Sequence, residues 1–137
     1  MRRALYVLAQ CVWGLPQTLV GLIVFVIFRL RRCPCRVFHG AVCTEWDRTD
    51  GVSLGLFIFC PPHGRLHPHE FGHTVQSLWL GPLYLPLVAL PSLVWCGLPA
   101  FKRYRRVKNV PYSRLWCEGW ADREGERMKR RAARRNS

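Results

Sequence analysis

The stretch His69-Glu70-Phe71-Gly72-His73 matches the pattern H-E-x-x-H. If it is helical, His69 and His73 lie at i and i+4 and project from one face, one turn apart. Two imidazole nitrogens at that spacing can reach one Zn²⁺ ion at about 2.0–2.1 Å. Glu70 starts about 100° around the helix, beside the metal, where it is suited to act as a general base. Such a short pattern also recurs by chance, so the alternative is two ordinary packed or capping histidines.

A second run, EGWAD, supplies the ligand that two histidines lack. A catalytic zinc site has three protein ligands and one open position. Glu118 and Asp122 are again i and i+4, so both would face the first helix. Glu118 can complete the ligand set, and Asp122 can accept a hydrogen bond from the distal nitrogen of a ligating histidine. The alternative is an acidic, solvated helix face, which nearby Glu124 and Glu126 would extend.

Together, HEFGH and E-x-x-A-D resemble the gluzincin metallopeptidases, in their smallest form. The stretches GVSLGLFIF, GHTVQSLWLGPLYLPLVALPSLVW and LWCEGWADREG resemble a group of small membrane-associated bacterial proteins, and C-terminal segments of some Rhs-type toxins. The resemblance implies that His69, His73 and Glu118 are the ligands of a Zn²⁺ cofactor. It also implies that Glu70 is the general base and that Asp122 supports a ligating histidine.

The composition indicates a membrane protein. Half of the residues are hydrophobic, yet Lys and Arg outnumber Asp and Glu by 21 to 8. Residues 4–28 carry no charge and are flanked by arginines; as one helix they would span about 37 Å, more than the roughly 30 Å hydrocarbon core. We predict that residues 1–36 form a transmembrane anchor with basic flanks, kinked at Pro16, rather than a cleaved signal peptide. The excess of Lys and Arg from residue 29 onward predicts that the domain lies on the cytoplasmic side. The resemblance implies that the membrane is the bacterial inner membrane.

Residues 37–128 are expected to form the domain. Residues 37–46 and 52–60 are apolar, with a turn at 47–51 between them, which predicts one β-hairpin. The expected fold class is α+β: a zincin-like core of a β-hairpin plus two metal-site helices, with an N-terminal transmembrane helix. The resemblance further implies that residues 53–59 form an edge strand that binds extended peptide by β-augmentation.

Residues 78–101 are uncharged but contain four prolines, Pro82, Pro86, Pro91 and Pro99. A full membrane crossing would place the two halves of the zinc site on opposite sides. We therefore expect this segment either to enter and leave the membrane on one face or to form apolar core resting on the bilayer. The alternative is that it does cross, and that the chain has no zinc site.

Two basic stretches follow. Residues 102–108 read KRYRRVK, and a cluster of this kind beside an apolar segment attracts anionic lipid headgroups. Residues 129–137 form a basic tail that we expect to be solvated and disordered. Neither stretch shows the aromatic interleaving or recognition fold that sequence-specific nucleic-acid binding requires.

The remaining cysteines and histidines are weaker candidates. The seven cysteines form no regular disulfide framework: Cys11, Cys33, Cys35, Cys43, Cys60, Cys96 and Cys117. Cys33-Pro34-Cys35 lacks the second cysteine pair that a metal site of that type needs. His63 and His67 lie among prolines and are interpreted as loop residues near the cleft, with metal ligation as the alternative.

The sequence therefore predicts a membrane-associated zinc-dependent peptidase that hydrolyses peptide bonds with a zinc-activated water and Glu70 as general base. Expected partners are a peptide or protein substrate and anionic membrane lipid. Tyr112 and His67 are candidates for the group that stabilises the oxyanion. Two alternatives stay open: a zinc-binding, non-hydrolytic membrane protein, and a basic membrane adaptor without metal.

Overall fold

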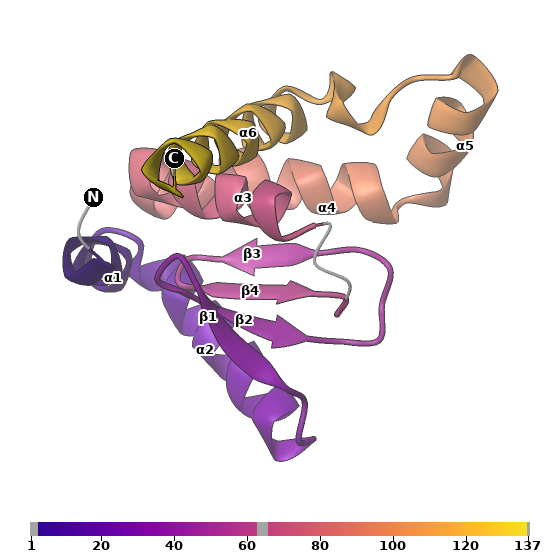
Figure 1. Ribbon diagram of the computed structural model, residues 1–137. Helices are drawn as coiled ribbons and strands as arrows, with labels where there is room; N and C mark the ends of the chain where they lie inside the picture. The colour runs from indigo at the N-terminus through magenta and orange to yellow at the C-terminus, as the bar shows by residue number, and fades with distance from the viewer. Residues whose placement is uncertain (1–2, 63–65, 137) are drawn as a thin grey trace.

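The computed structural model describes residues 3–62 and 66–136 and has an α+β fold, as the sequence predicts (Figure 1). Within these residues a four-stranded mixed sheet is combined with six α-helices. The helices are α1 (Arg3–Val12), α2 (Leu15–Leu30), α3 (His67–Leu80), α4 (Leu90–Gly97), α5 (Pro99–Lys108) and α6 (Trp116–Asn136). Shorter helical turns are formed by Gly81–Leu83, Leu85–Ala89 and Tyr112–Arg114.

The sheet consists of two hairpins rather than the single hairpin predicted. Its strands are β1 (Cys35–Phe38), β2 (Ala41–Glu45), β3 (Val52–Leu54) and β4 (Phe57–Cys60), in the order β1-β2-β4-β3. The β1–β2 and β3–β4 pairs are antiparallel, whereas β2 and β4 run parallel. Each predicted strand reverses direction within itself because the backbone adopts positive φ at His39, Gly40 and Gly55. The 47–51 turn therefore joins two hairpins instead of closing one.

Strand β4 is covered on both faces. Its four residues are all buried, and alternation along the strand sends them to opposite sides. Phe57 and Phe59 pack against α2, with ring centroids 5.1 Å from Phe25 and 5.9 Å from Phe28. Ile58 and Cys60 belong to a cluster on the opposite face, which includes side chains of α1 and α3. The sheet thus lies between α2 and α3.

The N-terminal apolar segment is two helices, not the one predicted over residues 4–28. α1 and α2 meet at an angle of 98° across Trp13 and Gly14, and Pro16 lies in the first turn of α2. Over the described part of the chain, no single helix is both long and apolar enough to cross a membrane. Two bent pairs satisfy the length and composition together: α1 with α2, and Leu85–Gly97 with α5.

Buried polar side chains attach these helices to α3. Gln10 donates through Nε2 to the carbonyl of Thr74 over 2.9 Å, and Gln17 donates to Ser77 Oγ over 2.8 Å. Ser77 Oγ in turn donates to Gln10 Oε1 over 2.9 Å. Because unsatisfied buried amides are costly, this reciprocal arrangement fixes the position of α1 and α2 relative to α3. The segment predicted to be a membrane anchor therefore packs against the domain.

The chain between α3 and α6 leaves the core and returns, so that α6 lies along α3 (Figure 1). The two helices approach backbone to backbone: a Cβ on Gly72 would lie 2.1 Å from the carbonyl oxygen of Ala121. The excursion through residues 78–101 consequently does not separate the two halves of the predicted site. α6 continues through Asn136, so residues 129–136 are helical rather than disordered, as their Lys, Arg and Ala content favours.

Candidate metal centre

The structure brings His69, His73 and Glu118 together. The histidines lie one turn apart on α3, with ring centroids separated by 4.8 Å. Glu118, on the first turn of α6, is fully buried against them. Its Oε2 lies 3.0 Å from Nε2 of His69 and 3.3 Å from Nε2 of His73. Two nitrogens and one carboxylate oxygen thus converge on one point.

This arrangement fits a zinc ion. Ligands at about 2.0–2.1 Å around a tetrahedral zinc lie about 3.3 Å from one another, which agrees with the separations between Glu118 Oε2 and the two imidazole nitrogens. Glu118 Oε2 is buried, and among the described residues it has no hydrogen-bond partner apart from the two imidazole Nε2 atoms that face it. A buried carboxylate oxygen in that state is costly unless a cation neutralises it. The His₂Glu set also leaves the open position that a catalytic zinc site has.

Each candidate ligand is held through its other polar atom. His69 Nδ1 lies 2.7 Å from Asp122 Oδ1, the partner expected from the sequence. His73 Nδ1 lies 2.8 Å from Gln76 Oε1, and Ser92 donates to Glu118 Oε1. Neither Gln76 nor Ser92 was predicted from the sequence. Helical spacing could have indicated Gln76, three residues after His73. Ser92 reaches the site only because the 78–101 segment folds back.

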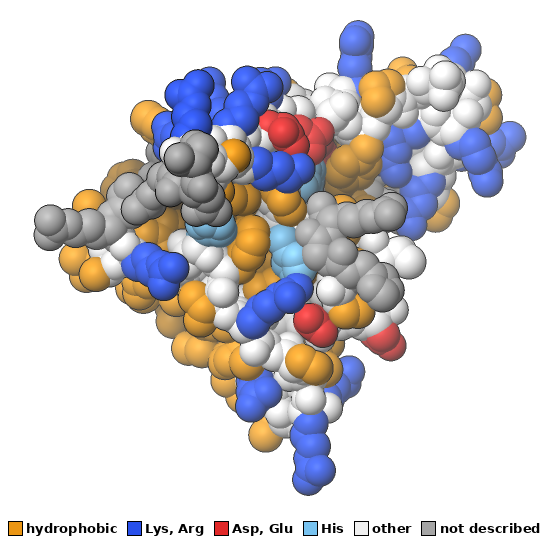
Figure 2. Space-filling view, in the orientation of Figure 1, with side chains coloured by type: hydrophobic (Ala, Val, Ile, Leu, Met, Phe, Trp, Pro, Cys, Tyr) orange, Lys and Arg blue, Asp and Glu red, His pale blue; other side chains and the backbone are white. Residues whose placement is uncertain are grey.

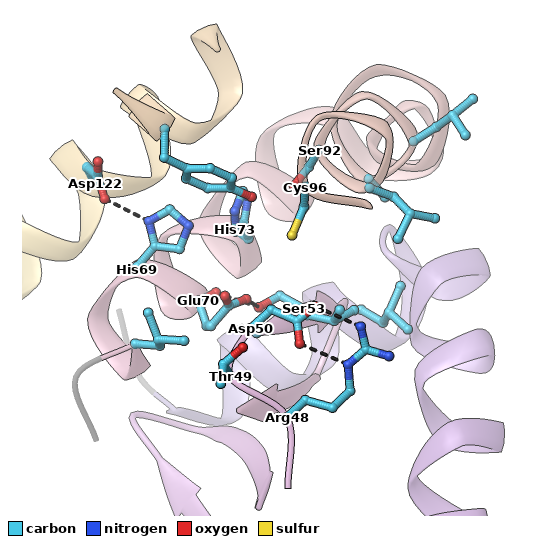
Figure 3. A pocket seen from close by; sticks show the side chains of 18 of the residues that line it. Arg48, Thr49, Asp50, Ser53, His69, Glu70, His73, Ser92, Cys96 and Asp122 are labelled. Atoms are coloured by element: carbon cyan, nitrogen blue, oxygen red, sulfur yellow. Dashed lines mark hydrogen bonds and ion pairs between the residues drawn. The ribbon is translucent and has the colours of Figure 1, made fainter. Parts of the chain in front are cut away.

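Glu70 lies beside these ligands, in the wall of the cleft (Figure 3). Its side chain is buried, and Ser53 Oγ lies 2.7 Å from its Oε2 and 2.8 Å from its backbone carbonyl oxygen. Burial raises the pKa of the Glu70 carboxyl, although the imidazoles of His73 and His69 oppose that rise. A raised pKa favours exchange of a proton near neutral pH, as a general base requires.

Electrostatic coupling links the two helices without metal. Burial alone would lower the pKa of His69, but the carboxylates of Glu118, Glu70 and Asp122 outweigh it and raise that pKa to about 9. Burial alone would likewise raise the pKa of Glu118, but His69, His73 and Ser92 hold it well below its usual range. The metal-free centre therefore carries an imidazolium–carboxylate pair at neutral pH.

A cleft of about 1260 Å³ opens onto the centre. One wall is formed by residues 47–54, which include β3, and the opposite wall by residues of α3 and α4 (Figure 3). β3 is an edge strand, the kind of strand with which an added strand can pair, and its Ser53 carbonyl oxygen already accepts a hydrogen bond from the Tyr84 hydroxyl over 2.8 Å. Of the segment 53–59, predicted to be one edge strand, only Ser53 and Leu54 lie in an edge strand. Residues 57–59 belong to β4, which is already paired on both sides.

The other candidates lie in different places. Tyr112 lines the cleft, with its ring centroid 6.3 Å from that of His69. His67 is buried beside Cys43 and Cys60, away from the cleft, so the interpretation as a cleft-lining loop residue is wrong. The reason is that α3 begins at His67 and turns its ring toward the sheet. His63 lies outside the described residues.

Comparison of the chain with protein-family models, with curated proteins and with solved structures finds no match.

Proposed function

We propose that this protein is a membrane-associated zinc-dependent peptidase with a zincin-like core. The convergence of His69 Nε2, His73 Nε2 and the buried Oε2 of Glu118 carries the proposal. Three further features support it: Glu70 stands beside this point, a cleft opens onto it, and an edge strand borders the cleft. These are the parts that metal-assisted peptide hydrolysis needs.

The chain's own residues have separate tasks in that reaction. When bound, zinc would polarise the scissile carbonyl and lower the pKa of a water molecule. Glu70 would take the proton from that water and deliver it to the leaving amine. Ser53 orients the Glu70 carboxylate through Oε2, while β3 offers backbone groups to an extended substrate. Asp122 and Gln76 hold the two imidazoles in the orientation that directs both Nε2 atoms at the metal.

Surface chemistry supports the membrane part of the proposal. Apolar side chains lie exposed over α1 and α2, and Lys and Arg side chains gather at α5 and α6 (Figure 2). Leu30 is 80% exposed, Val12 69% and Ile23 63%. A large exposed apolar surface of this kind is typical of proteins that contact a membrane or another protein. The basic α5 helix favours a bilayer with anionic headgroups.

The test compares metal content and hydrolysis in full-length variants purified without chelators. His73→Ala and Glu118→Ala are each expected to lose one equivalent of zinc relative to the wild type. Glu70→Gln is expected to keep that zinc and to lose at least about 100-fold in cleavage of a fluorogenic peptide library. Glu126→Gln, an exposed acidic position farther along α6, serves as the control and should retain both. Unchanged zinc in the ligand variants, or cleavage that survives Glu70→Gln, would refute the proposal.

A further inference from the structure

A second cluster of metal-ligating side chains lies on the sheet. Cys43 on β2, Cys60 on β4 and His67 at the start of α3 are all buried, at 0%, 0% and 4% exposure. The two Sγ atoms are 3.2 Å apart, and one ligand atom from each of the three residues lies within 4.8 Å of the others. None of the three is among the described residues that line the cleft.

The parallel pairing of β2 and β4 brings the cysteines together. Cys43 is opposite Ile58, and Cys60 is opposite Glu45, so the two cysteines are diagonal neighbours on one face of the sheet. That face is the one covered by α3, where His67 begins the helix. Because β2 and β4 are the inner strands, the positions of both thiols are fixed by pairing on both sides.

We propose that Cys43, Cys60 and His67 bind a second zinc ion through two thiolates and one imidazole. Zinc binds thiolate sulfur at about 2.3 Å and imidazole nitrogen at about 2.0–2.1 Å, so two sulfur ligands of a tetrahedral ion lie about 3.8 Å apart. The Sγ atoms need to separate by only about half an ångström from their present 3.2 Å. Two soft sulfur donors and one nitrogen form a set that favours zinc over magnesium or calcium.

Charge balance is compatible with this assignment. Binding of Zn²⁺ releases one proton from each thiol to solvent, so the total charge of the cluster does not change. Arg36 is the neighbouring cation: its Nη2 lies 3.0 Å from His67 Nε2 and 3.6 Å from Glu45 Oε1. The Arg36 side chain is 49% exposed, so it can release the imidazole and keep its ion pair with Glu45.

Such an ion would have a positioning role for the first centre. It would join both inner strands to the first turn of α3, two residues before His69. The second site stands independently of the peptidase proposal, because it shares no ligand with the His₂Glu centre. Failure of either one leaves the other open to test.

Cobalt substitution separates the two centres. Co²⁺ bound by two thiolates shows a strong sulfur-to-metal charge-transfer band in the near ultraviolet, whereas a His₂Glu centre has no sulfur ligand. Full-length wild-type protein loaded with two equivalents of Co²⁺ is expected to show this band, and His73→Ala to retain it. Cys43→Ser and Cys60→Ser should each abolish or strongly weaken the band. Cys96→Ser controls for the thiol that lines the cleft and should leave it intact.

If the cysteine variants fail to fold, the Co²⁺ spectrum of the wild-type protein can still refute the proposal. Absence of the charge-transfer band in wild type with two equivalents of Co²⁺ would exclude thiolate ligation. A band lost in Cys96→Ser would place the sulfur in the cleft instead. A Cys43–Cys60 disulfide, found by mass spectrometry after alkylation without reductant, would assign the pair to redox chemistry rather than metal binding.

Discussion

Gln76 selects the tautomer of the His73 ring. The Gln76 amide donates through Nε2 to the backbone carbonyl of Cys117 over 2.6 Å, which identifies its NH₂ end. Its Oε1, 2.8 Å from His73 Nδ1, can then only accept, so Nδ1 carries the proton. In the neutral tautomer with this proton, Nε2 of His73 carries none and faces Glu118, which is the form that a metal ligand requires.

Replacement of Gln76 by Leu should weaken zinc binding at the His₂Glu centre by about 10–100-fold, because the His73 ring loses the acceptor that orients it. Competition with a chromogenic chelator measures the zinc affinity of each variant. Gln76→Glu keeps an oxygen acceptor for Nδ1 and should lose less affinity than Gln76→Leu. Equal losses in the two variants would show that Gln76 acts only through its bond to Cys117.

Gly72→Ala should force α3 and α6 apart, since the added Cβ would meet the carbonyl of Ala121 at 2.1 Å. We expect a loss of about 1–3 kcal/mol in the free energy of unfolding, together with weaker zinc binding. Chemical denaturation and metal analysis report the two effects. Gly97→Ala is the control, because a Cβ there meets no atom within 4 Å. Wild-type stability in Gly72→Ala would contradict the close approach of the helices.

The stability of the metal-free protein should fall as the pH rises from about 6.5 to about 9. The folded-state pKa of His69 is about 9, above the ordinary 6.5, so protonated His69 stabilises the fold fully below pH 6.5 and ceases to do so above pH 9. The difference corresponds to about 3 kcal/mol. Denaturant unfolding in the presence of chelator, on either side of this window, measures it.

His69→Gln is the control for that titration, and its stability should vary much less over the same range. Zinc affinity should show the opposite trend, increasing with pH, because the metal competes with the proton for Nε2 of His69. A metal-free protein whose stability does not change between these pH values would show that His69 and Glu118 are not coupled.

Neutralisation of α5 should weaken binding to anionic vesicles. Arg103, Arg106 and Lys108 are exposed on this helix, and each charge near an anionic surface contributes about 1 kcal/mol. The triple Gln variant should therefore bind such vesicles about 100-fold less tightly in a flotation assay. Binding to vesicles of neutral lipid should be nearly unchanged, since it depends on the apolar surface. Equal losses on both vesicle types would indicate damage to the fold.

The local parts of the candidate site could be predicted from the sequence. The i and i+4 spacings of His69 with His73, and of Glu118 with Asp122, depend only on helix geometry. Asp122 consequently lies where the sequence analysis expected it, 2.7 Å from His69 Nδ1. Chain connectivity also required segment 78–101 to return so that the two halves of the site could meet, and the structure brings them together.

The parts that were wrong depend on contacts between distant segments. His39 adopts φ 51° although it is not glycine, so the turn that divides the first predicted strand had no strong local signal. The single transmembrane helix over residues 4–28 was predicted from the length of the run and its lack of charge. Neither property reveals that Gln10 and Gln17 form hydrogen bonds with residues of α3. Ser92 joins the centre through a bond to a residue 26 positions later.

The packing of α2 on Phe57 and Phe59 also bears on how the protein is made. Residues 15–30, which form α2, are synthesised before the sheet that this helix covers. Gln10 and Gln17 form hydrogen bonds with residues that lie 64 and 60 positions further along the chain. Contacts of such long sequence separation form late, so until α3 has been translated α1 and α2 expose both their apolar and their polar side chains. Early engagement of this segment by a bilayer or a chaperone would shield it during that interval.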